Sequence, residues 1–435
     1  MKLISAIAVV VLLIPQPARS QGSTTSTTQQ RAVVEKAIEY VSANYVFPEK
    51  ASAVAAALMK NVAAGKYASL TKLDDFLDAV NSDMQAAGAD KHLRISNNAR
   101  IVQQLKAEAA GTSQASPEYV AMLRGQNFRL KRVETLDGNV GYFKFDNFVE
   151  LEFCRESLAG AMNFLHYTAA LILDLTDNGG GSSDAADYLI SYFLKDGTTI
   201  GTSWNRQTNN TTTSSVVRAS EVRQMLETPL FIMVSERTAS AAEGVAYALQ
   251  SARRAVVIGA QTRGLANPGV RFPIDDRLFI MVPTISSKNA ITGTNWDGTG
   301  ITPDIRVPAA KALHKAWAEA LKALAASAKD MQERSRLLFA ATGFDYLVAP
   351  QSPPAGFLGQ CVGEYEEGQQ IVMREGALYF VKGDIDRKLT YMNDHTFIVE
   401  GRNDYRMKFP LAGTLVDHCE VLWFDDTADR YKKIR

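Results

Sequence analysis

The sequence has little of what metal and redox chemistry requires. Only three cysteines and five histidines occur among 435 residues, and no CxxC or HExxH spacing brings them together. We therefore predict no metal site and no cofactor. A net charge is also lacking, because 47 basic residues balance 47 acidic ones. No overall electric field therefore favours nucleic acid or an anionic membrane surface as a partner.

Long apolar runs are rare as well. The N-terminus reads "MKLISAIAVVVLLIPQPARS", in which a lysine precedes a short apolar run and small residues precede Gln21. This pattern is typical of a secretory signal peptide, here residues 1–20, and its apolar run is too short to span a bilayer comfortably. No second run in the sequence is long enough for a transmembrane helix. We expect a periplasmic or secreted protein without a transmembrane anchor after signal cleavage.

The few cysteines have separate interpretations. Cys154 stands alone in "LEFCRESL" and is expected to be a small, buried apolar residue. Cys361 and Cys419 both lie in the C-terminal region, where an exported protein can join such a pair. We therefore predict these two residues as a candidate disulfide.

The N-terminal part of the mature chain is predicted to be helical. Residues 21–30 are rich in Ser, Thr and Gln, and we expect a disordered leader there. Residues 31–95 form a predicted helical domain. At helical spacing, one face of "RAVVEKAIEYVSANY" carries the apolar residues Val34, Ala37, Ile38 and Val41.

Residues 96–330 alternate between two patterns. The run "NVGYFKF" is predicted to be a strand, and the continuous apolar runs "AALILDL", "PLFIMVS" and "AVVIGA" are expected to be strands buried on both faces; the run "RLFIMVPTI" adds another strand. Helix-like stretches of about 10–15 residues separate the first four runs. We therefore predict an α/β core with a largely parallel sheet.

The C-terminal part changes character again. Residues 331–356 are predicted to be a linker that ends in Pro- and Gly-rich sequence. Residues 357–435 contain short alternating strands, with Gly, Asn and Asp at the turns between them. We predict a small antiparallel β domain, either a barrel or a sandwich.

A glycine-rich turn is the first candidate for chemistry. In "LILDLTDNGGGSSDAADYL" an apolar strand runs through Asn178 and three glycines into a helix. Uncovered backbone N–H groups at such a turn can hold an anion or a developing oxyanion. The alternative is a flexible tight turn without a functional role.

The second candidate is Ser240 in "SERTASAAEG". It also follows an apolar strand and begins a helix, and in an open parallel sheet the carboxyl ends of the strands are where sites form. A nucleophilic serine and an ordinary helix N-cap are both consistent with this position. Glu243, three residues on, completes a capping-box pattern, and we assign it that role.

A serine nucleophile needs a base, and "GADKHLRI" offers His92. A structural histidine is the alternative interpretation. No lysine occurs from residue 239 to residue 287, so a nearby lysine base is not offered by this segment. Asp90 and Asp297 are both able to orient the imidazole, and the residues alone leave that choice open.

Taken in order, these stretches resemble a known family. "DKHLRI", "GNVGYFKF", "LILDLTDNGGG", "SERTASAAEG", "IGAQTRGLANPG" and "WDGTGITPDI" are similar to motifs of the tail-specific (C-terminal processing) serine peptidase superfamily. The similarity is greatest to its branch with the tricorn core and interphotoreceptor retinoid-binding protein, and it covers about residues 31–325. It implies crotonase/ClpP-like βα repeats in the core and a serine endopeptidase activity.

The resemblance also implies roles for individual residues. Ser240 matches the nucleophile, His92 the base and Asp297 the acid. The oxyanion hole corresponds to the N–H of Ala241 and to a glycine N–H. The glycine is Gly179 or Gly180, and the candidate substrate-binding residues are Arg263 and Asn178.

The chain departs from the family pattern at several positions. Leu265 stands where the lysine branch carries its base, which excludes a Ser/Lys dyad. Asp297 replaces the usual glutamate, and Lys91 stands where the tricorn-type tetrad has a serine. The interval from Ile95 to Asn139 is too short for a PDZ domain, so selection of C-terminal tails is not implied.

The expected function is therefore hydrolysis of peptide bonds in peptides or unfolded proteins. The alternative is a non-catalytic binding protein of the same fold that carries a hydrophobic ligand or a peptide. The sequence makes no prediction of the oligomeric state.

Overall fold

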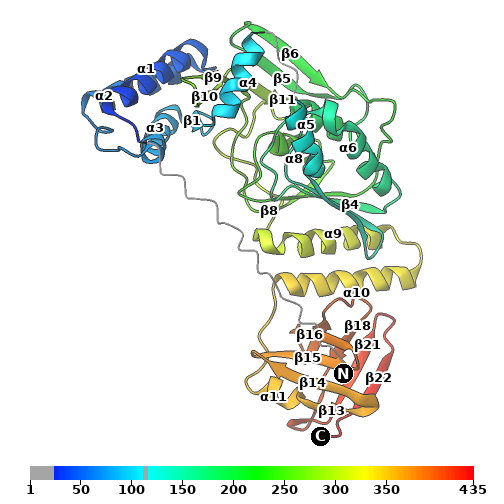
Figure 1. The fold of residues 1–435 in the computed structure, drawn as a ribbon. Coiled ribbons are helices and arrows are strands. Elements are labelled where there is room, and N and C mark those ends of the chain that lie inside the picture. The colour runs from blue at the N-terminus through cyan, green and yellow to red at the C-terminus, as the bar shows by residue number, and fades with distance from the viewer. Residues whose placement is uncertain (1–23, 111–115) are drawn as a thin grey trace, which may run out of the picture. The chain divides into compact units, whose positions relative to one another are not determined.

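A computed structural model describes residues 24–110 and 116–435 (Figure 1). The predicted signal peptide, residues 1–20, lies outside the described residues. The chain divides into two compact units, Met1–Ser113 with Gly269–Pro283, and Gln114–Pro268 with Thr284–Arg435. Among the described residues, none of the helices combines the length and the apolar character needed to cross a bilayer.

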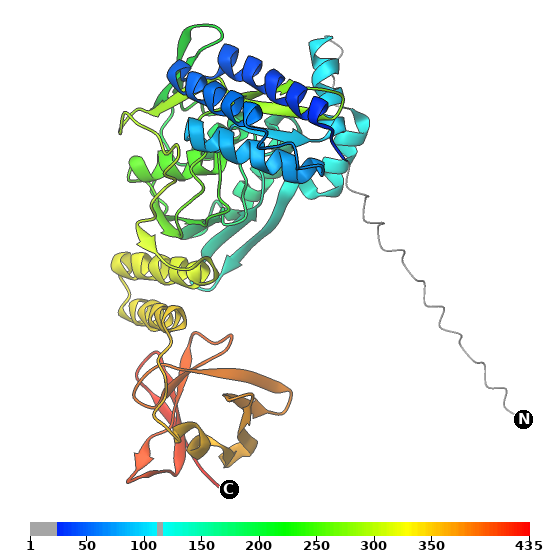
Figure 2. The same ribbon diagram turned by 90° about the vertical axis from the view of Figure 1, so that its left-hand side faces the viewer.

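The first unit is built on helices that lie side by side, seen in blue in Figure 2. They are α1 (Thr27–Asn44), α2 (Pro48–Ala63) and α3 (Leu73–Gly88), and the unit also contains α4 (Ala99–Ala109), which is drawn in cyan. The predicted apolar face of α1 is confirmed in part, since Val34, Ala37 and Val41 are buried and Ile38 is half-buried.

Helix α1 begins earlier than the sequence analysis expected. Ser26 Oγ accepts a hydrogen bond from the Gln29 N–H (3.3 Å), and the Gln29 side chain accepts one from the Ser26 N–H (2.9 Å). This reciprocal capping box satisfies two N–H groups at the start of the helix. The prediction of a disordered leader over residues 21–30 is therefore wrong from Thr27 onward.

A hairpin from the middle of the sequence belongs to the first unit. Its strands are β9 (Gly269–Pro273) and β10 (Leu278–Pro283), and β10 pairs antiparallel with β1 (Arg94–Asn97). Tyr40 of α1 stacks on Phe272 with ring centroids 4.9 Å apart. The sequence analysis had assigned this segment to the 96–330 core, because pairing over such a long stretch of chain leaves no local signal.

The second unit contains a six-stranded sheet in the order β12-β8-β7-β4-β3-β2. Neighbouring strands are parallel except for β2, which is antiparallel to β3 at one edge. The predicted strand at residues 139–145 is confirmed as β3, and the three apolar runs predicted as buried strands are confirmed as β4, β7 and β8. The bounds of the sheet strands are β2 Leu130–Leu136, β3 Val140–Phe145, β4 Ala170–Asp174, β7 Leu230–Val234, β8 Val256–Gly259 and β12 Ile305–Arg306.

Helices cover both faces of this sheet (Figure 1). Helices α6 (Leu151–Leu165), α7 (Ser183–Ile190) and α8 (Ala241–Ser251) supply one core, and α9 (Ala312–Ser327) with α10 (Met331–Val348) supplies the other. The remaining elements before α9 are α5 Pro117–Gly125, η1 Asn127–Arg129, the antiparallel strands β5 Thr199–Asn205, β6 Asn210–Ser215 and β11 Ile285–Asn289, and η2 Ala309–Lys311.

Helix α10 occupies most of the predicted linker, so that prediction is wrong for residues 331–348. Asp330 caps the helix by accepting a hydrogen bond from the Gln332 N–H at 2.9 Å. Phe344 stacks on Trp317 of α9 with centroids 4.3 Å apart. Burial of an apolar stripe against α9 thus stabilises a helix in this segment, and only the Pro- and Gly-rich sequence after it is not helical up to Phe357.

The C-terminal region is a meander of antiparallel strands, as predicted. Its eight-stranded sheet closes on itself, because Tyr365 of β13 forms a bridge with Lys433 and the Glu364 N–H donates to Arg435 O at 2.8 Å. Its elements are α11 Phe357–Cys361, β13 Gly363–Tyr365, η3 Glu366–Gly368, β14 Gln369–Arg374, β15 Ala377–Lys382, β16 Ile385–Tyr391, β17 Thr396–Val399, β18 Tyr405–Lys408, β19 Leu411–Ala412, β20 Leu415–Val416, β21 His418–Trp423 and β22 Ala428–Lys432.

The predicted disulfide is not formed in the structure. Cys361 and Cys419 are free and lie in the apolar interior of the C-terminal barrel, and Cys154 is free and lies on the buried face of α6, as predicted. Burial raises the pKa of the Cys154 thiol to about 11 and those of Cys361 and Cys419 to about 12.

We predict that these thiols are unreactive until the chain unfolds. Because burial disfavours the thiolate, which is the nucleophilic form, the native protein reacts slowly with a disulfide reagent such as DTNB at pH 8. In denaturant without reductant, all three cysteines react. Titration of a single thiol under those conditions contradicts the free pair and restores the disulfide.

Candidate active site

Ser240 sits at a sharp turn between strand β7 and helix α8 in the second unit. Its backbone has φ 55° and ψ −121°, a conformation that side-chain-bearing residues rarely adopt. Such strain persists only where the surroundings impose it. The residue is partly exposed, whereas the strand before it is fully buried.

The carboxylate of Glu243 imposes this geometry. It is fully buried and accepts hydrogen bonds from the Ser240 N–H (2.8 Å), the Gly264 N–H (2.7 Å) and the Leu265 N–H (2.8 Å). A fourth donor is the hydroxyl of Thr262. The predicted capping role of Glu243 is thus confirmed, and the same carboxylate also ties the helix to residues 262–265.

The glycine turn after β4 packs directly against Ser240. A Cβ atom on Gly180, whose φ is +97°, would lie 2.7 Å from Ser240 Cβ and 3.1 Å from the Ala241 nitrogen. Only glycine fits this approach. Ser240, Ala241 and Gly180 therefore lie close together in the second unit.

Asn178 organises the glycine turn instead of facing a substrate. Its side chain is fully buried, its Oδ1 accepts from the Gly180 N–H at 2.9 Å, and its Nδ2 donates to Phe145 O at 3.2 Å. The prediction of Asn178 as a substrate-binding residue stays a prediction, and its shown contacts are those of a turn-forming residue. One N–H and the carbonyl oxygen of this amide thus hold the turn to its own backbone and to β3.

Both predicted glycine donors already make hydrogen bonds within the turn. The Gly180 N–H is held by Asn178, and the Gly179 N–H donates to Asp146 O at the longer distance of 3.3 Å. Because hydrogen bonds weaken with length, the Gly179 N–H is the easier of the two to redirect.

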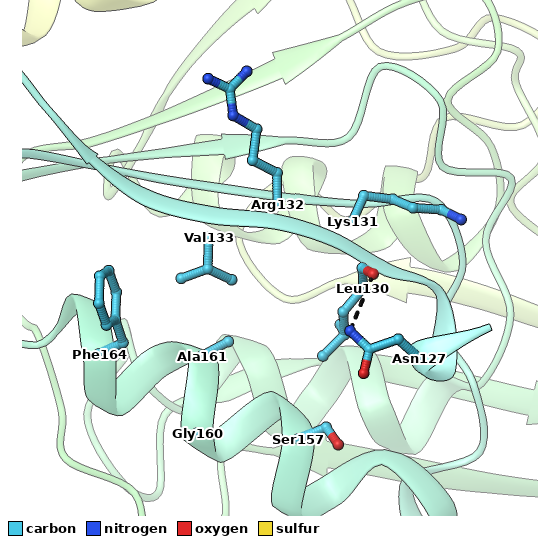
Figure 3. A pocket seen from close by; sticks show the side chains of 9 residues that line it. All are labelled: Asn127, Leu130, Lys131, Arg132, Val133, Ser157, Gly160, Ala161 and Phe164. Atoms are coloured by element: carbon cyan, nitrogen blue, oxygen red, sulfur yellow. Dashed lines mark hydrogen bonds between the residues drawn. The ribbon is translucent and has the colours of Figure 1, made fainter. Parts of the chain in front are cut away.

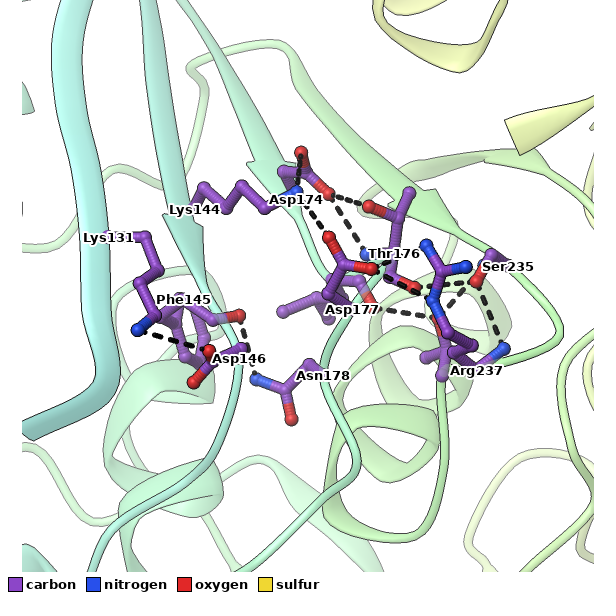
Figure 4. A network of polar contacts seen from close by, with 12 residues as sticks. Lys131, Lys144, Phe145, Asp146, Asp174, Thr176, Asp177, Asn178, Ser235 and Arg237 are labelled. Atoms are coloured by element: carbon purple, nitrogen blue, oxygen red, sulfur yellow. Dashed lines mark hydrogen bonds and ion pairs between the residues drawn. The ribbon is translucent and has the colours of Figure 1, made fainter. Parts of the chain in front are cut away.

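Hydroxyl groups that the sequence analysis did not single out join the two turns (Figure 4). Thr238 Oγ1 donates to Leu175 O at 2.7 Å, and Ser235 Oγ donates to Thr176 O at 2.6 Å. Both residues are fully buried. They hold the segment after β7 against the segment after β4. Their only sequence signal is a Ser or Thr shortly after the end of a buried strand.

Charged side chains beside these turns are balanced. Lys144 donates to Asp177 at 2.6 Å and lies 3.4 Å from Asp174, while Arg237 also pairs with Asp177 (Figure 4). Lys144 and Arg237 hold the pKa of the Asp177 carboxyl below its ordinary value. Two cations thus face two carboxylates at this edge of the sheet.

Asp297 is held by a neighbouring amide. Its N–H donates to Asn295 Oδ1 (3.1 Å), and the Asn295 Nδ2 donates to Ser287 O (2.7 Å) and to Asn267 Oδ1 (3.1 Å). The Asp297 Oδ1 accepts a hydrogen bond from the Ala266 N–H at 3.3 Å. The carboxylate is therefore anchored to the segment that follows Leu265.

Leu265 has a backbone role where the lysine branch has a base. Its N–H donates to Glu243, and its carbonyl accepts from the Trp296 indole N–H at 3.1 Å. The segment 262–267 consequently connects the residues that hold Ser240 with those that hold Asp297. Arg263, the other candidate substrate-binding residue, is exposed within this segment.

His92 belongs to the first unit. Asp90 is buried, accepts hydrogen bonds from the His92 N–H (2.8 Å) and the Tyr45 hydroxyl (3.0 Å), and has its Oδ1 3.8 Å from His92 Nδ1. Burial lowers the pKa of His92 from its ordinary value of 6.5, and the charge of Asp90 opposes that shift. Since Ser240 and Asp297 lie in the other unit, the triad with His92 stays a prediction.

Comparison with known proteins decides the family. Residues 139–307 match the model described as peptidase family S41. Residues 23–130 match the model described as the N-terminal domain of peptidase S41 in eukaryotic IRBP. The chain belongs to peptidase family S41. The resemblance to tail-specific and C-terminal processing serine peptidases is thereby confirmed.

Individual relatives of this S41 chain cover only part of it. The chloroplastic carboxyl-terminal-processing peptidase 1 of Arabidopsis thaliana is 31% identical over 182 residues, which is 41% of this chain and 36% of the relative. The carboxy-terminal-processing protease of Bartonella bacilliformis is 30% identical over 180 residues, 40% of this chain and 39% of the relative. The similarity thus spans well under half the length of each relative.

A solved structure with a similar course is that of a putative peptidase from Parabacteroides merdae. It is 17% identical, covers 64% of this chain and 90% of its own, and has a TM-score of 0.44.

We predict that Glu243→Gln destabilises the S41 chain. The introduced amide N–H₂ replaces one acceptor oxygen and faces backbone N–H donors, which leaves buried polar groups unpaired at a cost of about 1–3 kcal/mol. Urea unfolding measures the change. The matched control is Glu236→Gln at an exposed position of the same turn, which is expected to stay within about 0.5 kcal/mol of the parent. Equal stability of the two variants contradicts the assignment.

Proposed function

We propose that this S41 chain is a serine endopeptidase that hydrolyses peptide bonds in peptides and unfolded proteins. The observation that supports this best is the strained backbone of Ser240, held by the buried Glu243 carboxylate beside a glycine turn. A serine on a tight strand-to-helix turn presents its hydroxyl at the carboxyl edge of the sheet.

In the proposed reaction, His92 takes the proton of the Ser240 hydroxyl as Oγ bonds to the peptide carbonyl carbon. Asp297 holds the imidazole in the useful tautomer and stabilises its charged form. The C–N bond then breaks as His92 returns the proton to the leaving amine. A water molecule, activated by His92 in the same way, hydrolyses the acyl-enzyme and restores Ser240.

The negative charge on the carbonyl oxygen needs backbone donors. The Ala241 N–H is the first of helix α8, where N–H groups lack intrahelical partners. We propose Gly179 as the second donor, because its present bond to Asp146 O is longer than that of Gly180 to Asn178. Losing one such donor typically lowers the rate by about 10²–10³-fold.

The substrate range and location follow from the same reasoning. Between β1 and β2 the described residues hold α4, α5 and η1, so we propose cleavage within unfolded chains instead of selection of C-terminal tails. We also propose export, on the basis of the N-terminal signal-peptide pattern. The relation of the βα units to the crotonase and ClpP folds is proposed from the resemblance.

We predict that Ser240→Ala abolishes proteolysis and leaves the fold intact. Removing the attacking oxygen lowers the rate by about 10⁴-fold or more in serine peptidases. The measurement is release of acid-soluble fragments from casein, with circular dichroism as the check on folding. The hydrolysis assay is paired with a serine-directed fluorophosphonate probe, which is expected to label the parent at Ser240. Absence of labelling in the parent, together with binding of a hydrophobic ligand, favours the alternative of a non-catalytic binding protein.

We predict an acidic limb in the pH profile with an apparent pKa below 6.5. His92 is the base only when neutral, and burial lowers its pKa from that ordinary value. Because the Asp90 charge raises the pKa of His92, Asp90→Asn moves the limb to still lower pH while its Oδ1 still accepts the His92 N–H. The measurement is kcat/KM for a short peptide against pH. A limb at or above 6.5, or one that Asp90→Asn moves upward, contradicts the assignment.

A further inference from the structure

The edge strand β2 of the six-stranded sheet is unoccupied on its outer side. It pairs with β3 alone, and among the described residues no other strand is hydrogen-bonded to it. A free edge presents alternate N–H and C=O groups that can pair with an added strand.

A hollow of about 490 Å³ lies beside this edge, between β2 and helix α6. Figure 3 shows Leu130 and Val133 directed toward the helix, whereas Arg132 points the other way. An irregularity in the pairing of β2 at Lys131 brings two apolar residues three positions apart onto the same side. The helix contributes small residues at the floor of the hollow and the ring of Phe164, which is 60% exposed, at its rim.

Gly160 keeps the hollow open. A Cβ atom at this position would meet nothing within 4 Å, so packing does not require glycine there. Glycine within a helix is also less favourable than alanine. The open space above Gly160 therefore accommodates an incoming side chain without any movement of the protein.

The end of the hollow next to Leu130 carries an excess positive charge. The Asp146 carboxylate lies 2.6 Å from Arg129 and 3.3 Å from Lys131, so one anion serves two cations. Arg132, in contrast, is neutralised by Glu134 at 2.6 Å. An acidic side chain is therefore complementary to the hollow at the Lys131 end.

The same end adjoins the candidate active site. Asp146 O accepts the Gly179 N–H of the glycine turn, and the Asp146 N–H donates to Arg129 O at 3.2 Å. Figure 4 shows Lys131, Asp146 and Asn178 at the end of the sheet where the parallel strands finish. A chain extended from the Ser240 region thus reaches the start of β2 past Asp146.

We propose that the outer edge of β2 and the hollow over Gly160 bind the polypeptide substrate as an added strand. A large apolar side chain fills the hollow, and an acidic side chain lies near Lys131. This inference rests on the proposed function, since it describes how an unfolded substrate is held beyond the cleaved bond.

The test is Gly160→Leu, which fills the hollow with a side chain that favours a helix. The probe is a fluorescein-labelled, strand-length peptide of Leu, Thr and Asp, titrated by anisotropy against the full chain carrying Ser240→Ala. Loss of an apolar anchor pocket weakens binding about tenfold. The matched control is Gly359→Leu in α11, where a Cβ also meets nothing within 4 Å, and it leaves binding unchanged. Lys131→Met weakens binding of this peptide, but it does not weaken binding of an analogue that has Lys in place of Asp.

Equal affinity of the Gly160→Leu and Gly359→Leu proteins for the labelled peptide overturns the proposal that the hollow binds substrate. Sedimentation that finds a dimer dissociated by Gly160→Leu also overturns it, because a second copy then occupies the edge. Since binding is measured without catalysis, the two proposals fail separately. A parent chain that does not cleave casein but loses peptide binding through Gly160→Leu contradicts the peptidase and supports binding in the hollow.

Discussion

A single buried carboxylate, that of Glu243, holds together the parts of the candidate site. It accepts three backbone N–H groups and a hydroxyl, and these come from two segments of the second unit. Burial alone raises the pKa of this carboxyl, and the four donors oppose that effect. The strain at Ser240 is therefore maintained by an interaction three residues away.

The segment 262–267 connects Glu243 to Asp297 through its backbone. Leu265 contacts Glu243 through its N–H and Trp296 through its carbonyl, and Ala266 donates to Asp297. Asp297, which we propose as the acid, thus has a backbone anchor of its own. In the lysine branch a side chain from this segment performs the chemistry, whereas here the main chain of the same segment holds its neighbours.

The sequence identifies the buried strands and the candidate nucleophile because both have local signals. Apolar runs mark β4, β7 and β8, a strand-like stretch marks β3, and a Ser followed by Glu after an apolar run marks the start of α8. Thr238 and Ser235 were missed because a hydroxyl after a strand has no periodicity to mark it. The turn contacts of Asn178 were not predicted, because a polar residue in a glycine turn suggests a ligand as readily as a turn contact. Helix α10 was missed because only the packing partner in α9 reveals its apolar stripe.

The hairpin β9–β10 makes the first unit discontinuous in sequence, which has a consequence for synthesis. The helices that precede His92 leave the ribosome early, but the strand that pairs with β1 ends only at Pro283. Ser240 is therefore synthesised before the unit that carries His92 is complete. During translation, the first unit still lacks its hairpin while most of the parallel strands of the second unit are made, so the order of residues along the chain delays completion of the first unit until then.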